Sequence, residues 1–180
     1  FLEGTKKRKI CVEKANEIFD QISAFAGYGF NKSHAAAYAL IAYQTAWVKT
    51  NYIYEFFVSM MTVENNNTEK LSLFVEDAKK LGLKILQPCI NKSGYEFLIE
   101  GISSSEFGIR YSLSSIKNVG TDAIKKVVKI RDKDGEFKNI DDFLNRVPYG
   151  LITKKSFESL VKSGAFDIIE TNRNKLYKSI

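Results

Sequence analysis

The sequence predicts a predominantly α-helical protein with a small β element, an α+β fold. Apolar residues recur at helical spacing over most of residues 11–81, and again in shorter segments after residue 113. Only residues 84–111 change to the period of strands. The chain has 180 residues, of which 44% are hydrophobic, so its composition is that of a folded protein with room for one large domain or two small ones.

The first predicted helix is amphipathic and covers residues 11–26. It follows a basic stretch, Lys6-Lys7-Arg8-Lys9, that we interpret as a surface turn, and it ends at Gly27-Tyr28-Gly29. One face of this helix carries its apolar residues at spacings of three and four: Val12, Ala15, Phe19, Ile22 and Ala26.

The second predicted helix runs from Ser33 to about Thr50 and, after a break near Asn51-Tyr52, resumes to Thr62. Its uncharged run from Ala35 to Val48 has 14 residues. A bilayer requires roughly 20, so we expect a buried core helix and no membrane span.

The middle of the chain combines one helix with two short strands. A polar loop, Glu64-Asn65-Asn66-Asn67, precedes a helix with Thr68 as its predicted N-cap and Leu81 near its end, where Gly82 is placed for a C-terminal cap. The strands are predicted on either side of the turn Ser103-Ser104-Ser105, at Tyr95–Ile99 and Phe107–Tyr111.

The start of the second helix is a candidate phosphate site. The first backbone N–H groups of a helix have no partners within it and carry partial positive charge, so they attract anions. Asn31 or Ser33 is a suitable N-cap, and Lys32 and His34 add donors at the same place. The alternative is an ordinary cap with two surface residues. A catalytic Ser-His pair is rejected, because such pairs need a third, orienting acid and an oxyanion hole.

A helix-hairpin-helix is predicted around residues 116–129. A short helix, a tight turn ending at Gly120 and a second helix would place backbone N–H groups where a DNA phosphate can bind. Glycine is expected there for the turn conformation and for close approach of the ligand. In the second helix Ala123, Ile124, Val127 and Val128 form the buried stripe, whereas Lys125, Lys126 and Lys129 lie opposite. A second helical unit, Thr153 to Gly164, carries Lys154 and Lys155.

Charge supports this assignment, because the basic excess lies in the C-terminal third. Residues 1–112 hold 13 Lys and Arg against 12 Asp and Glu, a balance of +1. Residues 113–180 hold 14 against 9, a balance of +5. A local excess of this sign fits a polyanionic partner. The alternative is a solvated basic face on a small helical packing unit.

Several stretches, in this order, resemble bacterial replicative DNA polymerases of the C family, the polymerase III alpha subunits of gram-negative type. The resemblance covers nearly the whole chain. It is carried by Gly27-Tyr28-Gly29-Phe30-Asn31-Lys32-Ser33-His34, Ala37-Tyr38-Ala39, Tyr43-Gln44-Thr45-Ala46-Trp47, Glu55-Phe56, Met60-Met61-Thr62, Gly82-Leu83-Lys84-Ile85-Leu86, Pro88, Ile90-Asn91, Ile109-Arg110-Tyr111, Ile116-Lys117-Asn118-Val119-Gly120 and Ser163-Gly164-Ala165-Phe166-Asp167.

This resemblance implies a fragment with three parts: distal fingers helices (1–62), a small α/β connector (63–112) and a tandem helix-hairpin-helix region (113–180). It implies that the fingers residues Lys32, Ser33, His34 and Tyr38 lie close to the triphosphate of an incoming deoxynucleotide. A core position for the Tyr38 ring is the alternative. The expected contacts to the DNA backbone come from Lys117, Asn118, Gly120, Thr121, Lys125 and Lys126. The other implied partners are primer-template DNA and, through regions outside this chain, replisome subunits that include the sliding clamp.

No catalytic or metal-binding residue is predicted in this chain. The two cysteines, Cys11 and Cys89, are far apart and the chain has one histidine, so a zinc site is not expected. Two acidic pairs, Glu76-Asp77 and Asp141-Asp142, lie on predicted helices. The two residues of each pair are adjacent in sequence, so their side chains point in different directions. The magnesium ions of the intact enzyme are therefore expected outside this chain, and the fragment alone is expected to be inactive. A cytoplasmic location without a membrane partner is the default.

Two other functions remain open from the sequence. The chain could be a stand-alone, non-enzymatic helix-hairpin-helix module, or a structural α-rich domain without a ligand. The missing initiator Met and the opening within a helical pattern favour a piece of a longer protein.

Overall fold

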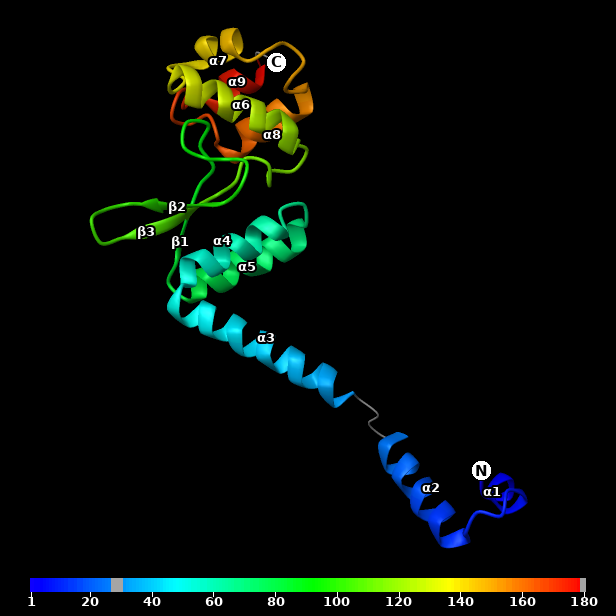
Figure 1. Cartoon of the computed structure of the whole chain (residues 1–180). Coiled ribbons are helices and arrows are strands. Elements are labelled where there is room, and N and C mark those ends of the chain that lie inside the picture. The colour runs from blue at the N-terminus through cyan, green and yellow to red at the C-terminus, as the bar shows by residue number, and fades with distance from the viewer. Residues whose placement is uncertain (27–30, 179–180) are drawn as a thin grey trace. The chain divides into compact units, whose positions relative to one another are not determined.

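A computed structural model of the chain, shown in Figure 1, describes residues 1–26 and 31–178. It is predominantly helical with one small sheet, which confirms the predicted fold class. The predicted helix end at Gly27-Tyr28-Gly29 lies outside the described residues. The elements in chain order are α1 (Leu2–Lys7), α2 (Val12–Ala26), α3 (Lys32–Asn51), α4 (Ile53–Val63), α5 (Thr68–Lys80), β1 (Lys84–Leu86), β2 (Leu98–Gly101), β3 (Phe107–Arg110), α6 (Thr121–Asp134), α7 (Ile140–Arg146), α8 (Lys154–Ser163) and α9 (Arg173–Lys178).

The chain divides into two compact units, Phe1–Trp47 and Val48–Ile180. In the first unit α1 packs against α2, and the rings of Phe1 and Phe19 lie 5.8 Å apart. The expected basic turn is partly wrong, because Lys6 and Lys7 belong to the last turn of α1. Lysines are favourable there, since the last turn of a helix carries partial negative charge.

The second predicted helix exists as α3, but its expected burial is wrong. Every position of α3 is exposed, and Ala15 of α2 is the one buried residue among the described residues before the break at Tyr52. Apolar composition favours a helix that seeks burial, whereas burial itself requires a second apolar surface against it. Of the helices in the described ranges, none has the length and apolarity that crossing a membrane would require.

The second unit begins with a helical pair, α4 and α5, that packs against the sheet. Their shared core consists of Phe57, Met61, Leu71, Ala78, Leu83, Phe97 and Ile109. The predicted cap of α5 is off by one residue: the side chain of Asn67 accepts from the N–H of Lys70, and Thr68 is the first helical residue. Asn67 has the extended backbone that an N-cap requires, with φ −107° and ψ 91°.

The sheet has the order β1-β3-β2, with β1 parallel and β2 antiparallel to the central strand β3. Strand β2 begins at Leu98 rather than at the predicted Tyr95, and β1 was not predicted as a strand. Before β2, the Tyr95 carbonyl accepts hydrogen bonds from the hydroxyls of Ser112 and Ser114, so it is taken up by side chains instead of a strand partner.

Helices α6 to α9 share a second core. It is rich in aromatic rings from separate elements, with Phe137, Phe143, Phe157 and Phe166 all buried. Arg131 of α6 joins this bundle to the connector loop by donating to the carbonyls of Ile90, at 3.1 Å, and Ser93, at 2.6 Å. The Ile90 N–H donates to the Ala165 carbonyl at 2.7 Å, so the loop is held from two sides.

Candidate nucleic-acid interface

The start of α3 has the predicted cap. The side chain of Asn31 accepts from the backbone N–H of Ser33 at 2.9 Å and of His34 at 3.4 Å, which makes Asn31, not Ser33, the capping residue. Lys32, Ser33 and His34 are exposed together on the first turn. The Tyr38 ring lies 4.3 Å from the His34 ring, centroid to centroid, and is 61% exposed, so Tyr38 is a surface residue here and not a core aromatic.

The structure describes no helix where the first helix of the hairpin was predicted, before Gly120. Residues 113–119 instead form two consecutive turns, closed by bonds from the Ile116 N–H to the Leu113 carbonyl and from the Val119 N–H to the Ile116 carbonyl. The nearby serines are engaged elsewhere, with Ser115 donating to the side chain of Asn65 at 2.5 Å. Short polar side chains that bond in this way compete with a regular helix.

The expected backbone role of Gly120 is also wrong. Gly120 is the N-cap of α6 with φ −80° and ψ 134°, an extended conformation that any residue adopts. The left-handed conformation lies two residues earlier, at Asn118, with φ 68°. Asparagine tolerates it better than most residues. Around Gly120 the space is open, because a Cβ built there would have no atom within 4 Å.

Helix α6 presents the predicted basic side. Ile124, Val127 and Val128 are buried in the bundle core, whereas Lys125, Lys126 and Lys129 are exposed. The ammonium group of Lys125 lies 5.3 Å from the centroid of the Tyr95 ring. Lys117 is exposed just before the helix start, and Thr121 is its half-buried first residue.

A second hairpin is formed by α7, a connecting loop and α8. The Thr153 side chain caps α8 by accepting from the Ser156 N–H at 3.2 Å, and Gly164 ends the helix in the left-handed conformation, with φ 82°. Lys154 and Lys155 are exposed in the first turn. These two lysines and Thr153 were not among the predicted DNA contacts, although a Thr N-cap directly before Lys-Lys was a usable signal.

The two helix starts are tied together by side chains. The Ser156 hydroxyl donates to the Asn118 carbonyl at 2.6 Å and lies 2.8 Å from the Thr153 hydroxyl. The Asn118 side-chain amide lies 3.2 Å from the Ser159 hydroxyl. Asn118 is two residues before the N-cap of α6, so the first turn of α8 lies close to the start of α6. Two helix N-termini, each of which carries partial positive charge, therefore lie near each other, with Lys117, Lys154 and Lys155 close in sequence.

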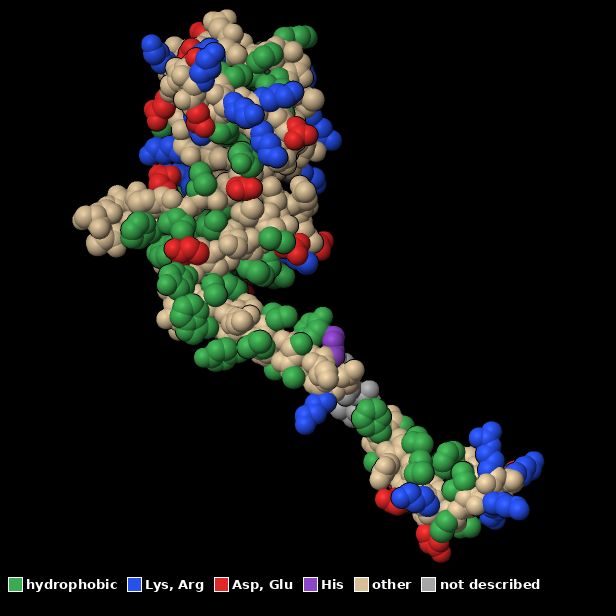
Figure 2. Space-filling model, viewed as in Figure 1, with side chains coloured by type: hydrophobic (Ala, Val, Ile, Leu, Met, Phe, Trp, Pro, Cys, Tyr) green, Lys and Arg blue, Asp and Glu red, His purple; other side chains and the backbone are tan. Residues whose placement is uncertain are grey.

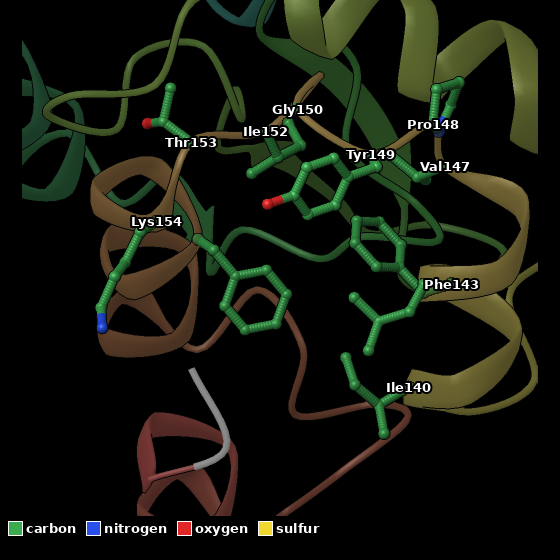
Figure 3. A pocket seen from close by; sticks show the side chains of 11 residues that line it. Ile140, Phe143, Val147, Pro148, Tyr149, Gly150, Ile152, Thr153 and Lys154 are labelled. Atoms are coloured by element: carbon green, nitrogen blue, oxygen red, sulfur yellow. The ribbon is translucent and has the colours of Figure 1, made fainter.

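A cavity of about 630 Å³ lies within the second hairpin. Its lining is mostly apolar, and in Figure 3 Tyr149 and Ile152 of the loop and Phe143 of α7 surround it, with Lys154 on α8. An apolar lining does not suit a triphosphate or a DNA backbone. The candidate polyanion contacts are therefore at the helix starts.

Charged side chains of both signs lie on the surface of the α6–α9 bundle (Figure 2). Figure 2 shows Lys and Arg side chains gathered over the α6–α9 bundle on the face in view, with Asp and Glu between them. Asp122 in the first turn of α6 and Glu158 of α8 are the acidic residues closest in sequence to the two helix starts.

The carboxylates do not form a metal site in the described residues. Those residues contain no group of three or more His, Cys, Asp or Glu that could hold an ion. Asp142 instead accepts from the Lys138 N–H at 3.0 Å and from Arg146 at 3.1 Å. The backbone bond from Lys138, followed by Arg146, lowers the pKa of Asp142. One carboxylate oxygen of Asp142 is thus engaged by both a backbone N–H and a guanidinium group.

Residues 82–176 match a protein family described as helix-hairpin-helix motif. The chain is also similar to proteins named DNA polymerase III subunit alpha. It is 44% identical over 167 residues to that of Thermus aquaticus, 41% over 179 to that of Caulobacter vibrioides and 43% over 180 to that of Borreliella burgdorferi. These alignments cover 93%, 99% and 100% of this chain but only 13%, 15% and 15% of the relatives.

Proposed function

The chain belongs to the helix-hairpin-helix motif family, and from that premise we propose that it is a segment of a replicative DNA-directed DNA polymerase. The support is the similarity to polymerase III alpha subunits along nearly the whole chain. In that protein we assign residues 1–62 to the distal fingers, 63–112 to a connector and 113–180 to DNA binding. The enzyme would act in the cytoplasm.

The proposed task of residues 113–180 is to hold duplex DNA by its backbone without reading sequence. The observation that carries this is the pair of adjacent helix starts, α6 at Thr121 and α8 at Lys154, joined through Asn118 and flanked by lysines. Backbone N–H groups and lysines bind phosphate oxygens, which are the same for every base pair.

We propose that the start of α3 binds the triphosphate of the incoming deoxynucleotide. Lys32, Ser33 and His34 share one exposed turn capped by Asn31, and the Tyr38 ring lies against the His34 ring one turn later. Phosphoryl transfer depends on positioning and charge neutralisation, so such groups matter without transferring protons. Catalytic carboxylates and their magnesium ions would belong to other parts of the polymerase, as would the contact with the sliding clamp.

Duplex binding tests the DNA assignment directly. We expect the 180-residue chain to bind labelled duplexes of unrelated sequence with similar, weak affinity. An affinity that differs more than tenfold between random sequences of equal length would contradict backbone recognition, since base readout is then required.

Primer extension tests the assignment of the chemistry. With magnesium, a primed template and all four deoxynucleotides, we expect the 180-residue chain to add no nucleotide. Template-dependent extension by the pure chain would falsify the assignment of the chemistry to other parts of the polymerase.

A further inference from the structure

We propose that Asn118 and Ser156 are positioning residues that fix the spacing between the α6 and α8 starts, so that one duplex contacts both at once. The proposal rests on the proposed function of residues 113–180. It changes the expected role of Asn118 from a direct DNA contact to a link between the start of α6 and the helix α8.

Asn118, two residues before the N-cap of α6, makes two contacts with α8. Its carbonyl accepts from Ser156 at 2.6 Å, and its side-chain amide lies 3.2 Å from the Ser159 hydroxyl. Its backbone is left-handed, with φ 68°, a conformation that few residues other than glycine adopt. Ser156 is only 7% exposed, so its hydroxyl is committed to this contact and to Thr153.

The geometry limits how far the two helix starts can separate. Consecutive Cα atoms are about 3.8 Å apart, so Gly120 lies within roughly 7 Å of Asn118 along the chain. Ser156 is in the first turn of α8. The first N–H groups of α6 and α8 are therefore close enough for neighbouring phosphates to engage both helices.

The link between the two helix starts also opposes electrostatic repulsion. Two positive helix ends repel each other, and Lys117, Lys154 and Lys155 add to that repulsion. Asp122 and Glu158 offset part of it. The polar link holds the two helix starts together against this repulsion. The free energy needed to bring the positive charges together is therefore spent when the protein folds and not when the polyanion binds, so the site is preorganised.

Three substitutions in the 180-residue chain test the link. Ser156→Ala removes the bond to the Asn118 carbonyl, Ser159→Ala removes the bond to its side chain, and Asn118→Gly keeps the left-handed backbone while deleting that side chain. The matched control is Ser163→Ala, because Ser163 also donates from α8 to a backbone carbonyl, that of Leu160 at 2.8 Å, but at the far end of the helix.

Affinity for a duplex is measured at several salt concentrations, with circular dichroism and thermal unfolding for each variant. Ser156→Ala, Ser159→Ala and Asn118→Gly are each expected to weaken duplex binding about two- to tenfold while the protein stays folded. Their plots of log affinity against log salt should be shallower by about 0.9, the loss of one phosphate contact. Ser163→Ala should keep both the affinity and the slope.

The outcomes separate this inference from the function on which it rests. Absence of salt-dependent duplex binding in the parent chain overturns the proposed function. Normal binding by the parent together with unchanged affinity and slope in every folded variant overturns the link alone. A variant that only lowers the unfolding temperature, with unchanged slope, also counts against it, because that is the effect of a purely structural contact.

Discussion

Gly120 differs from the sequence-based expectation in a way that sharpens its test. The sequence predicted a turn that ends at Gly120, and turns do precede α6, but the first helix of the predicted hairpin is absent among the described residues. The sequence could not show which residue adopts the left-handed conformation, since that depends on the contacts of Asn118 with α8. With φ −80° and open space around it, Gly120 accepts a side chain without strain.

Gly120→Ala should therefore keep the fold and weaken duplex binding, because a methyl group would occupy the space in which a phosphate approaches the α6 start. Alanine at a compatible glycine position stabilises a protein by about 0.4–1 kcal/mol through the unfolded state. The measurements are thermal unfolding and duplex titration.

The matched control is Gly101→Ala, at the end of β2, where a Cβ also meets nothing within 4 Å. Its duplex affinity should equal that of the parent. If Gly120→Ala binds duplex as well as Gly101→Ala does, no phosphate approaches the α6 start.

The α3 start leads to a prediction for the intact polymerase. Lys32→Ala and His34→Ala should each weaken nucleotide use, seen as a raised KM for the nucleotide, a lowered kcat or both. The loss of one charge-assisted hydrogen bond costs about 1.5–3 kcal/mol. Binding of primer-template should be spared, because the proposed DNA contacts lie in α6 and α8.

Lys14→Ala is the control, since Lys14 is an exposed lysine of α2 outside the predicted site. Steady-state kinetics on the three variants separates the alternatives. Equal kinetics in all three would mean that Lys32 and His34 are ordinary surface residues beside a helix cap.

At the scale of elements, the sheet contains a charge pair that the sequence did not reveal. Arg110 of β3 donates to both oxygens of Glu100 on β2, each at 2.6 Å, and to the Gln87 carbonyl at 2.7 Å. The bonds from Arg110 outweigh partial burial and hold the pKa of Glu100 below its ordinary range. The two residues are 10 positions apart on adjacent strands, so no local pattern encodes the pair.

The Arg110–Glu100 pair makes the free energy of unfolding depend on pH. Because the folded-state pKa of Glu100 is lowered, its contribution is present above the unfolded pKa and is lost as pH falls through the folded value. Glu100→Gln should lower the unfolding temperature at pH 7. In this variant the unfolding temperature should also decrease less steeply than in the parent as the pH drops below about 4.5. The control is Glu106→Gln, because Glu106 and Lys84 form an exposed pair of small expected effect. Similar acid profiles for Glu100→Gln and the parent would contradict this role.

Elements with strong local signals were predictable, and those that depend on distant partners were not. Helices α2, α3, α5, α6 and α8 follow from apolar spacing and caps. Strand β1 has three residues and exists through its pairing with β3. The turns at 113–119 replace a helix because nearby serines bond to Tyr95 and Asn65.

At the scale of the whole molecule, the basic C-terminal third corresponds to a discrete core. Residues 113–180 supply almost all of the second hydrophobic cluster, with Ile90 added from the connector. The lysines that the sequence identified on α6 are on its exposed side, as expected. The apolar composition of α3 predicted burial, but burial depends on what packs against the helix. The chain spans only 13–15% of the relatives' length, and its described residues bury no position of α3.

The central claim is that residues 113–180 bind the phosphate backbone of duplex DNA at the starts of α6 and α8, with the exposed lysines of α6 adding contacts. The most direct measurement is a duplex titration across salt concentrations with two double variants of equal charge change. One is Lys125→Ala with Lys126→Ala. The other is Lys79→Ala with Lys80→Ala, which removes two adjacent exposed lysines at the end of α5.

The account predicts that log affinity of the parent falls linearly with log salt, by about 0.9 for each phosphate neutralised. The α6 double variant should bind all duplexes more weakly and show a slope shallower by about one to two phosphates, whereas the α5 double variant should match the parent. An affinity that ignores salt, or an equal loss in both double variants, would contradict the claim.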